Sequence, residues 1–294
     1  MKLDDETLPQ LTIPGPTYDR TQTGVGIVHF GVGGFHRAHQ AAYVDQLLNA
    51  GVADGWGICG VGVLPADRRM ADVMAAQNGL YTLLLEPPDG TREARVIGSI
   101  LDYRFAPEDP DGVIELLAAP STRIVSLTIT EGGYFIDAST GKFDLKHPAI
   151  VADGENPDSP KTVFGLILAG LKRRRAEGTP PFTIMSCDNI PHNGDVTREA
   201  VVETARLSDP ALADWIVAHV SFPNAMVDRI TPVTTDETRA SILAETGIED
   251  RWPVRADVGC ASPLARGGDR LDGWRRCLCA AGGGDPGVGD VGRL

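Results

Sequence analysis

The sequence contains no run of about 18 apolar residues, the length that a helix needs to cross a bilayer. Its opening stretch, MKLDDETLPQ, also lacks the apolar segment of a secretory signal. The five cysteines are odd in number and no pair has Cys-x-x-Cys spacing, so neither a disulfide framework nor a zinc motif is indicated. We therefore expect a soluble, cytoplasmic chain with reduced thiols and no metal.

Basic residues are in the minority, with 27 Lys and Arg against 40 Asp and Glu and a formal net charge of -13. Such a chain repels phosphate backbones and anionic lipids, so nucleic acids and membrane surfaces are poor candidates for partners. The 294 residues are 42% hydrophobic and 23% charged, which is enough apolar material for a packed core and argues against a wholly disordered chain.

Short apolar runs alternate along the chain with segments of helical period. Residues 25–30 (VGIVHF) and 56–63 (WGICGVGV) are typical of buried strands, and a helical pattern follows each. The same patterns predict further strands at 81–87, 94–105, 122–129 and 181–186, the first two suiting a hairpin, and helices at 109–119, 163–175, 196–207 and 211–220. The stretch from about 137 to 160 is rich in Asp, Pro and Gly, which predicts a loop. This alternation predicts an α/β fold in which helices cover a parallel sheet.

Both ends of the chain differ in character from its middle. Residues 1–22 are polar and contain proline, which predicts an N-terminal arm. Residues 259–294 contain 10 of the 34 glycines and show neither a helical nor a strand period. Either this glycine-rich stretch is a flexible tail, or it is the product of a shifted reading frame or a broken gene, and we favour the second interpretation.

A glycine-rich turn, Gly31-Val32-Gly33-Gly34-Phe35-His36, lies between the first predicted strand and its helix. In a dinucleotide site the first glycine permits the turn, the second lets the backbone approach the pyrophosphate, and N–H groups at the helix start bind the anion. A third glycine would fall at 36, where this chain has histidine, so the strict G-x-G-x-x-G pattern is not met. The alternative is an ordinary glycine-rich turn.

Asp67 is the first acidic residue after the second predicted strand. A carboxylate there would accept hydrogen bonds from the adenosine ribose and repel a 2′-phosphate, which favours NAD over NADP. Arg68 and Arg69 follow directly and would have the opposite effect. Spacing alone equally supports Asp67 as the N-cap of the next helix.

Four segments carry a specific resemblance: GVGGFHRAHQAAYVDQLL, SLTITEGGY, SCDNIPHNG and FPNAMVDRITP. In this order, over about residues 24–240, they resemble the mannitol dehydrogenase family, a polyol-specific group that includes fructuronate and altronate oxidoreductases. The resemblance implies a Rossmann-like doubly wound sheet over residues 23–258, NAD(P) as hydride carrier and no metal. It also implies a mostly helical C-terminal substrate domain, of which we expect this chain to hold only the start.

The resemblance also assigns roles to individual residues. The pyrophosphate would be lined by the turn residues Gly31, Gly33, Gly34, Phe35 and His36, and the nicotinamide half by Thr130, Glu131 and Gly132. Asn189 would hydrogen-bond the reacting oxygen, and Asp228 would position substrate or cofactor. Plain alternatives exist for both, because Asp188-Asn189 suits a turn and Asp228-Arg229 suits a surface ion pair.

The implied reaction converts D-mannitol and NAD to D-fructose and NADH. We expect the chain to be a monomer whose partner is a small polyol or sugar acid. A fructuronate reductase, an altronate or arabinitol dehydrogenase and a non-catalytic NAD-binding fragment remain open. In the family the base is a lysine in a Lys-x-x-x-x-Asn-x-x-His pattern, which this sequence lacks, since its last lysine is Lys172 and its last histidine is His219. We therefore expect a truncated product that binds dinucleotide weakly and turns over polyol poorly.

Overall fold

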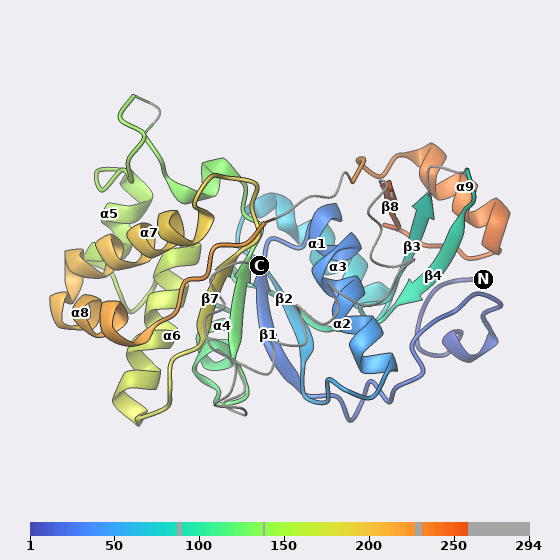
Figure 1. Cartoon of the computed structure of the whole chain (residues 1–294), viewed down its shortest axis with the longest axis horizontal. Coiled ribbons are helices and arrows are strands. Elements are labelled where there is room, and N and C mark those ends of the chain that lie inside the picture. Colours follow the sequence, from blue (N-terminus) through green and yellow to red (C-terminus); the bar gives the residue numbers. More distant parts are fainter. Residues whose placement is uncertain (87–89, 138, 227–230, 258–294) are drawn as a thin grey trace.

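The structure, a computed structural model, describes residues 1–86, 90–137, 139–226 and 231–257 (Figure 1). The glycine-rich stretch 259–294 and Asp228, both singled out in the sequence, lie outside these described residues. Within them, no helix combines the length and the apolar character needed to cross a membrane.

The central feature is a five-stranded parallel sheet with the order β5-β2-β1-β6-β7. Its strands are β1 (Val25–Phe30), β2 (Gly57–Gly62), β5 (Ile100–Phe105), β6 (Ile124–Leu127) and β7 (Thr183–Ser186). The chain winds outward from β1 in one direction and then from β6 in the other. This order confirms the Rossmann-like α/β prediction, and it places the reversal point, where such folds bind ligands, between β1 and β6.

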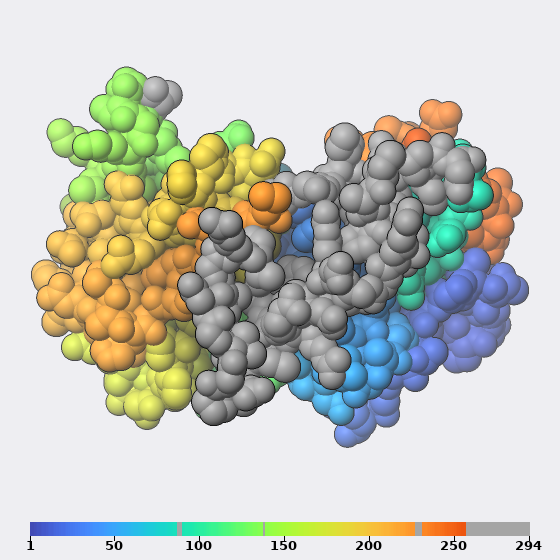
Figure 2. All heavy atoms as spheres, viewed as in Figure 1, coloured from blue at the N-terminus to red at the C-terminus, as the bar shows by residue number. Residues whose placement is uncertain are grey.

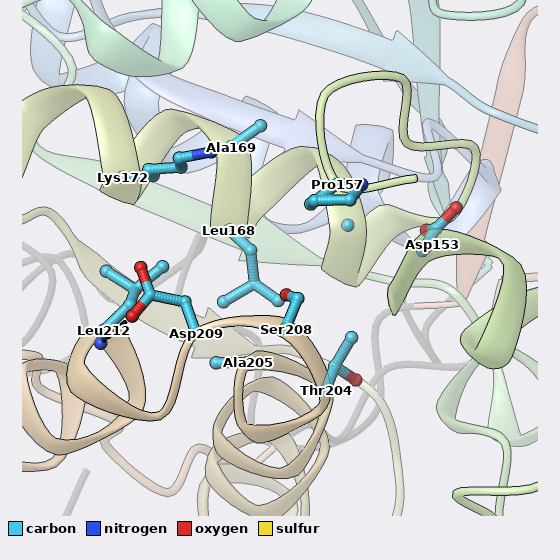
Figure 3. Close-up of a pocket in the computed structure, with 11 residues that line it drawn as sticks. Asp153, Pro157, Leu168, Ala169, Lys172, Thr204, Ala205, Ser208, Asp209 and Leu212 are labelled. Atoms are coloured by element: carbon cyan, nitrogen blue, oxygen red, sulfur yellow. Dashed lines mark hydrogen bonds between the residues drawn. The ribbon is translucent and has the colours of Figure 1, made fainter. Parts of the chain in front are cut away.

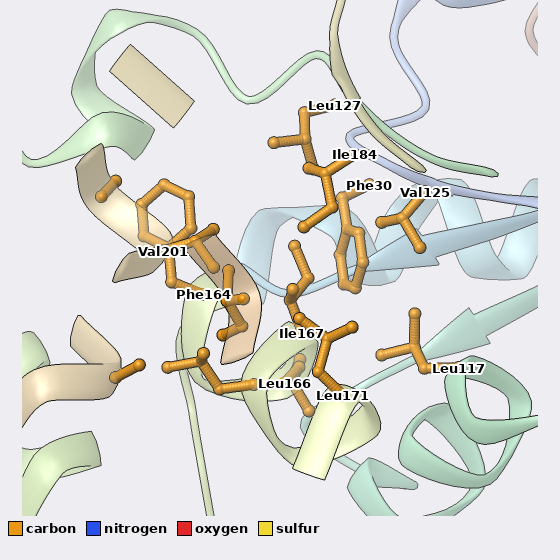
Figure 4. Close-up of a cluster of buried hydrophobic side chains, with 14 of the residues drawn as sticks. Phe30, Leu117, Val125, Leu127, Phe164, Leu166, Ile167, Leu171, Ile184 and Val201 are labelled. Carbon is orange, nitrogen blue, oxygen red and sulfur yellow. The ribbon is translucent and has the colours of Figure 1, made fainter. Parts of the chain in front are cut away.

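The strands are continuous apolar runs because both faces of the sheet are covered. Alternate side chains point to opposite faces. Val28 and Phe30 join one buried cluster with Phe164 and Ile167 (Figure 4), whereas Ile27 joins a second cluster on the other face.

Helices form a layer on each face of the sheet. One layer contains α4 (Pro110–Ala118) and α6 (Val163–Glu177), with α7 (Asn193–Ser208) packed against α5 (Pro148–Glu155) and α8 (Pro210–His219). The other contains α1 (Gly34–Ala38), α2 (Gln40–Asn49) and α3 (Arg68–Ala76). Figure 2 shows α7 and α8 as the yellow and orange surface on the left.

Two sequence predictions about helices were wrong. Residues 137–160 were expected to form a loop but contain α5, which starts at Pro148 and buries Ile150. Its Asp and Gly content obscured the helix, and Pro148 marks its first turn instead of breaking it. The single helix expected after the glycine turn is divided into α1 and α2 at His39, whose φ of -117° and ψ of -90° are not helical.

A second, three-stranded sheet lies beside the first, with the order β4-β3-β8. β3 (Tyr81–Glu86) and β4 (Glu93–Ile97) form an antiparallel hairpin, and β8 (Val254–Asp257) runs parallel to β3. The sequence patterns predicted neither β8 nor α9 (Asp236–Thr246). In residues 1–22, which include the short 3₁₀ helix η1 (Leu8–Gln10), Leu3 is buried with Leu80, Val96 and Ile248.

Candidate functional site

The turn after β1 has the geometry that the sequence predicted. Gly31 has a φ of +88°, and a Cβ atom on it would lie 2.1 Å from the carbonyl oxygen of Thr128. No other residue can adopt this backbone at such close approach without strain. The amide of Gly33 donates to the Gly31 carbonyl at 2.7 Å, and α1 begins at the next residue.

The start of α1 offers hydrogen-bond donors. Within the described residues the amides of Gly34, Phe35 and His36 have no acceptor, because the first N–H groups of a helix lack partners one turn earlier. Gly33 is exposed, and Gly34 and Phe35 are half-buried. Such a group of amides is suited to an anion such as a pyrophosphate.

The imidazole of His36 does not face this exposed turn. The ring is 1% exposed and stacks on His29, with centroids 3.4 Å apart and planes 12° apart. Burial lowers the pKa of His36 well below its ordinary value, and the neighbouring His29 and Arg37 lower it further. The imidazole of His36 therefore does not line the turn, and any contribution of this residue to ligand binding is that of its backbone N–H.

The buried side chain of His29 in β1 connects the glycine turn to β6 through hydrogen bonds. Its Nδ1 lies 2.8 Å from Ser126 Oγ and its Nε2 lies 2.9 Å from Thr128 Oγ1, which itself donates to the Gly31 carbonyl at 2.6 Å. Burial lowers the pKa of His29 to about 3, so the ring is neutral near pH 7. A neutral imidazole thus joins β1 to β6 beneath the glycine turn.

A second exposed turn stands at the carboxyl end of β6 and contains Thr130, Glu131 and Gly132, the residues expected near the nicotinamide half. Thr130 has a φ of 61° and a ψ of 169°, a region that costs a β-branched residue on the order of 1–3 kcal/mol. The surrounding structure must hold this backbone in place.

Asp188, a residue to which sequence reasoning gave no role in binding, holds it. Its Oδ1 accepts the amide of Thr130 at 2.9 Å, and its Oδ2 accepts the amide of Ile129 at 2.9 Å and the hydroxyl of Tyr134 at 2.7 Å. Burial raises the pKa of Asp188, while these donors lower it in part. No local pattern signals this role, because the partners lie 54 to 59 residues away in sequence.

Asn189 follows Asp188 and is exposed at the carboxyl end of β7. The backbone here is fixed by Asn193, whose side-chain amide donates to the Asp188 carbonyl at 3.1 Å and to the Ala225 carbonyl at 2.7 Å. Because β1, β6 and β7 are adjacent and parallel, the glycine turn, the Thr130 turn and Asn189 all lie along one edge of the sheet.

Asp67 lies beyond the carboxyl end of β2, on the same edge of the sheet. Its Oδ2 accepts the amides of Val63 at 2.8 Å and Leu64 at 2.9 Å, so the carboxylate closes the turn after β2. Asp67 also occupies the N-cap position of α3, the alternative from spacing, but its side chain accepts no amide of that helix. Both bonds use Oδ2, and no described residue donates to Oδ1.

Arg37 is a further residue that the sequence did not single out. It is 1% exposed, its Nε donates to the Gly33 carbonyl at 3.3 Å, and its Nη1 donates to the Trp252 carbonyl. Its guanidinium lies 5.3 Å from the ring centroid of Tyr81, whose hydroxyl donates to the Arg37 carbonyl at 2.6 Å. Arg37 thus ties the glycine turn to the second sheet.

A cavity occurs elsewhere, among helices α5 to α8 (Figure 3). None of its lining residues belongs to a strand or to the turns at the strand ends, so it is separate from the site above. In the part of the chain that the structure describes, no group of three His, Cys, Asp or Glu side chains is arranged to hold a metal.

Comparison with known proteins agrees with this geometry. The family model for the mannitol dehydrogenase Rossmann domain matches residues 25–257. Mannitol 2-dehydrogenase of Phaeosphaeria nodorum is 48% identical over 259 residues, which cover 88% of this chain and 45% of that relative. The polyol:NADP oxidoreductase of Gluconobacter oxydans is 47% identical over 256 residues, covering 86% of this chain and 52% of its own length.

Among solved structures, the ternary complex of Pseudomonas fluorescens mannitol 2-dehydrogenase with NAD and D-mannitol is similar with a TM-score of 0.85 and 52% identity. The match covers 87% of this chain and 53% of that one. This chain thus spans about half the length of the relatives that it matches. The matched family model covers most of its residues, and the chain therefore belongs to the mannitol dehydrogenase family.

Proposed function

We propose that this chain is the dinucleotide-binding part of an NAD-dependent oxidoreductase that interconverts D-mannitol and D-fructose. The observation that carries the proposal is the set of three amides at the start of α1, beside the reversal point of the sheet, that have no acceptor among the residues that the structure describes. A structural relative at 52% identity was solved with NAD and D-mannitol. Those two molecules are the cofactor and substrate that we assign to this chain.

The pyrophosphate would be held by the backbone amides of Gly34, Phe35 and His36, with Gly31 and Gly33 allowing its close approach. Oδ1 of Asp67 would accept a hydrogen bond from the adenosine ribose, which a 2′-phosphate would prevent. One relative is a polyol:NADP oxidoreductase, so this family contains both preferences. We assign NAD here because the Asp67 carboxylate stands at the end of β2.

The reacting end would lie over β6 and β7. Thr130, Glu131 and Gly132 would contact the nicotinamide half, and the Asn189 side-chain amide would donate to the oxygen of the carbinol. Asp228, outside the described residues, would position the substrate. When bound, NAD supplies the hydride acceptor, and these residues fix the orientation in which transfer occurs.

Position 33 offers a matched pair of variants to test the cofactor assignment. A Cβ on Gly33 meets nothing closer than 3.9 Å and its φ of -96° suits any residue, so Gly33→Ala and Gly33→Asp should both fold. In calorimetric titration we expect NAD to bind the unsubstituted chain and to bind the alanine variant more weakly. It should not bind the aspartate variant, because the new carboxylate repels a pyrophosphate. Equal affinity of all three would overturn the assignment.

Substrate is tested separately by NADH formation with D-mannitol, D-arabinitol and altronate, and by NADH consumption with fructuronate, which is already the ketone form. The proposal expects turnover with D-mannitol to exceed that with the others. A preference for a sugar acid or for arabinitol would move the assignment to that oxidoreductase. Binding of NAD without turnover of any of these compounds would make the chain a non-catalytic NAD-binding fragment.

A further inference from the structure

Asp188 is the buried centre of a small hydrogen-bonded group at the ends of β6 and β7, which we call the Asp188 cluster (Asp188, Tyr134 and Ser186). Asp188 is 8% exposed, Tyr134 is fully buried, and the Tyr134 hydroxyl lies 2.7 Å from both Asp188 Oδ2 and Ser186 Oγ. The turn that the cluster supports is exposed at Thr130, Glu131 and Gly132. The cluster therefore lies beneath residues that face solvent.

The contacts of this cluster fix the direction of the turn. The Asp188 carboxylate accepts two successive amides, Ile129 and Thr130, at 2.9 Å each. Thr130 is held at a φ of 61°, where a β-branched residue does not stay unless its surroundings oblige it to. The Thr130 carbonyl in turn accepts the amide of Gly133 at 3.0 Å, which closes the turn.

We infer that Asp188 is a positioning residue that sets the Thr130 turn in the conformation required to receive the nicotinamide end of the dinucleotide, an inference that rests on the proposed function. It acts on two neighbouring strands, because it also immediately precedes Asn189 and its own carbonyl is held by Asn193. A shift of Asp188 would therefore move both the Thr130 turn and the backbone of Asn189. Its carboxylate itself is occupied by protein donors and does not contact the ligand.

The chain supplies a matched control in Asp153, which has the same chemistry in a different place. Asp153 is 5% exposed and accepts two amides and a hydroxyl, those of Lys161 at 2.8 Å and of Thr162 at 2.9 and 2.6 Å. It lies in α5, away from the strand ends. Asp153→Asn and Asp188→Asn each place an amide NH₂ against backbone donors, so they should destabilise the fold by similar amounts.

The experiment measures binding of NAD and of ADP by calorimetry, below the unfolding temperature of each variant. ADP contains the adenosine and pyrophosphate but lacks the nicotinamide end. We expect Asp188→Asn to weaken NAD binding about tenfold, as loss of one charge-assisted hydrogen bond does, and to leave ADP binding unchanged. Asp153→Asn should bind both molecules as the unsubstituted chain does.

A second variant keeps the inference testable if Asp188→Asn fails to fold. Tyr134→Phe removes one donor to the carboxylate and retains the ring, and we expect a loss of about threefold for NAD alone. The positioning role is wrong if Asp188→Asn binds NAD as tightly as the unsubstituted chain, or if its affinities for NAD and for ADP fall equally. The same two outcomes apply to Tyr134→Phe if Asp188→Asn does not fold. If the unsubstituted chain binds neither, the proposed function fails as well, which is a separate outcome.

Discussion

At the scale of single residues, Gly31 has a backbone conformation and a close approach that only glycine tolerates without strain. We expect Gly31→Ala to lower the free energy of unfolding by about 3 kcal/mol or more, because the φ of +88° is strained for alanine and the new Cβ meets the Thr128 carbonyl. Gly51→Ala is the control, since its φ is +68° but nothing lies within 4 Å, and its loss should stay near about 1 kcal/mol. Urea unfolding measures both, and equal losses would contradict the steric explanation.

The stacked pair His29 and His36 makes stability depend on pH. Burial lowers both pKa values in the fold, that of His29 to about 3, whereas an unfolded histidine titrates near about 6.5. The contribution of these two histidines to the free energy of unfolding is therefore fully present above about pH 6.5. It is lost as the pH falls below that value, because there the histidines bind protons in the unfolded chain and not in the folded one. The buried carboxyls of Asp45, Asp188 and Asp250, whose pKa values are raised, oppose this fall.

Substitution of one histidine isolates its share of the pH dependence. In His29→Asn, stability between about pH 6 and pH 4 should fall less steeply than in the unsubstituted chain, by about 1.4 kcal/mol per pH unit for the one proton removed. Denaturant unfolding at a series of pH values gives both curves. Parallel curves would show that His29 is protonated equally in the folded and unfolded chains.

How far the sequence predicts a site residue depends on whether its signal is local. The glycines of the turn could be proposed as site residues because a strand, glycines and a helix follow one another within about ten residues. The Asp188 and Arg37 roles were missed because each depends on segments brought together by the sheets, as when Arg37 meets Trp252 across 215 positions. Asp228 and the expected role of Asn189 remain predictions.

At the scale of elements, predictability follows length and hydrophobic period. Helix α6 has 15 residues and was predicted from its helical pattern; the structure shows in addition that Thr162 caps its start by accepting the amide of Gly165 and that Gly178 ends it at a φ of 72°. Strand β8 has four residues and gains its place only by pairing with β3. Helix α9 buries only Ile242, so its sequence has little hydrophobic period to detect.

The second sheet is held against the glycine turn by Arg37, and this attachment can be tested. Arg37→Met keeps much of the side-chain volume but leaves the Gly33 and Trp252 carbonyls without this donor. We expect a loss of about 2–4 kcal/mol, with faster hydrogen exchange in β8 than in β6 or β7. Uniformly faster exchange in all three strands would show that Arg37 supports the whole fold instead of this contact.

At the scale of the whole molecule, the five-stranded sheet lies between two hydrophobic cores, one on each of its faces. Val28 and Phe30 belong to the core under α6 and α7, and Ile27 belongs to the core under α2. The turns at the ends of β1, β6 and β7 are therefore each supported by both cores. A ligand seated across these turns contacts the segments that link the two halves, so its binding should oppose global unfolding and not only local motion.

This gives a stability prediction for the complete chain. A ligand that binds only the folded state raises stability by about 2.7 kcal/mol at 100 times its Kd, and by about 1.4 kcal/mol for each further tenfold increase in concentration. For a chain of this size such a rise moves the Tm by about 5–10 °C. Scanning calorimetry at increasing NAD concentration should show the shift for the unsubstituted chain and none for Gly33→Asp, whose turn repels the pyrophosphate. An equal shift in both would mean that NAD acts without occupying the glycine turn, because the two chains differ only there.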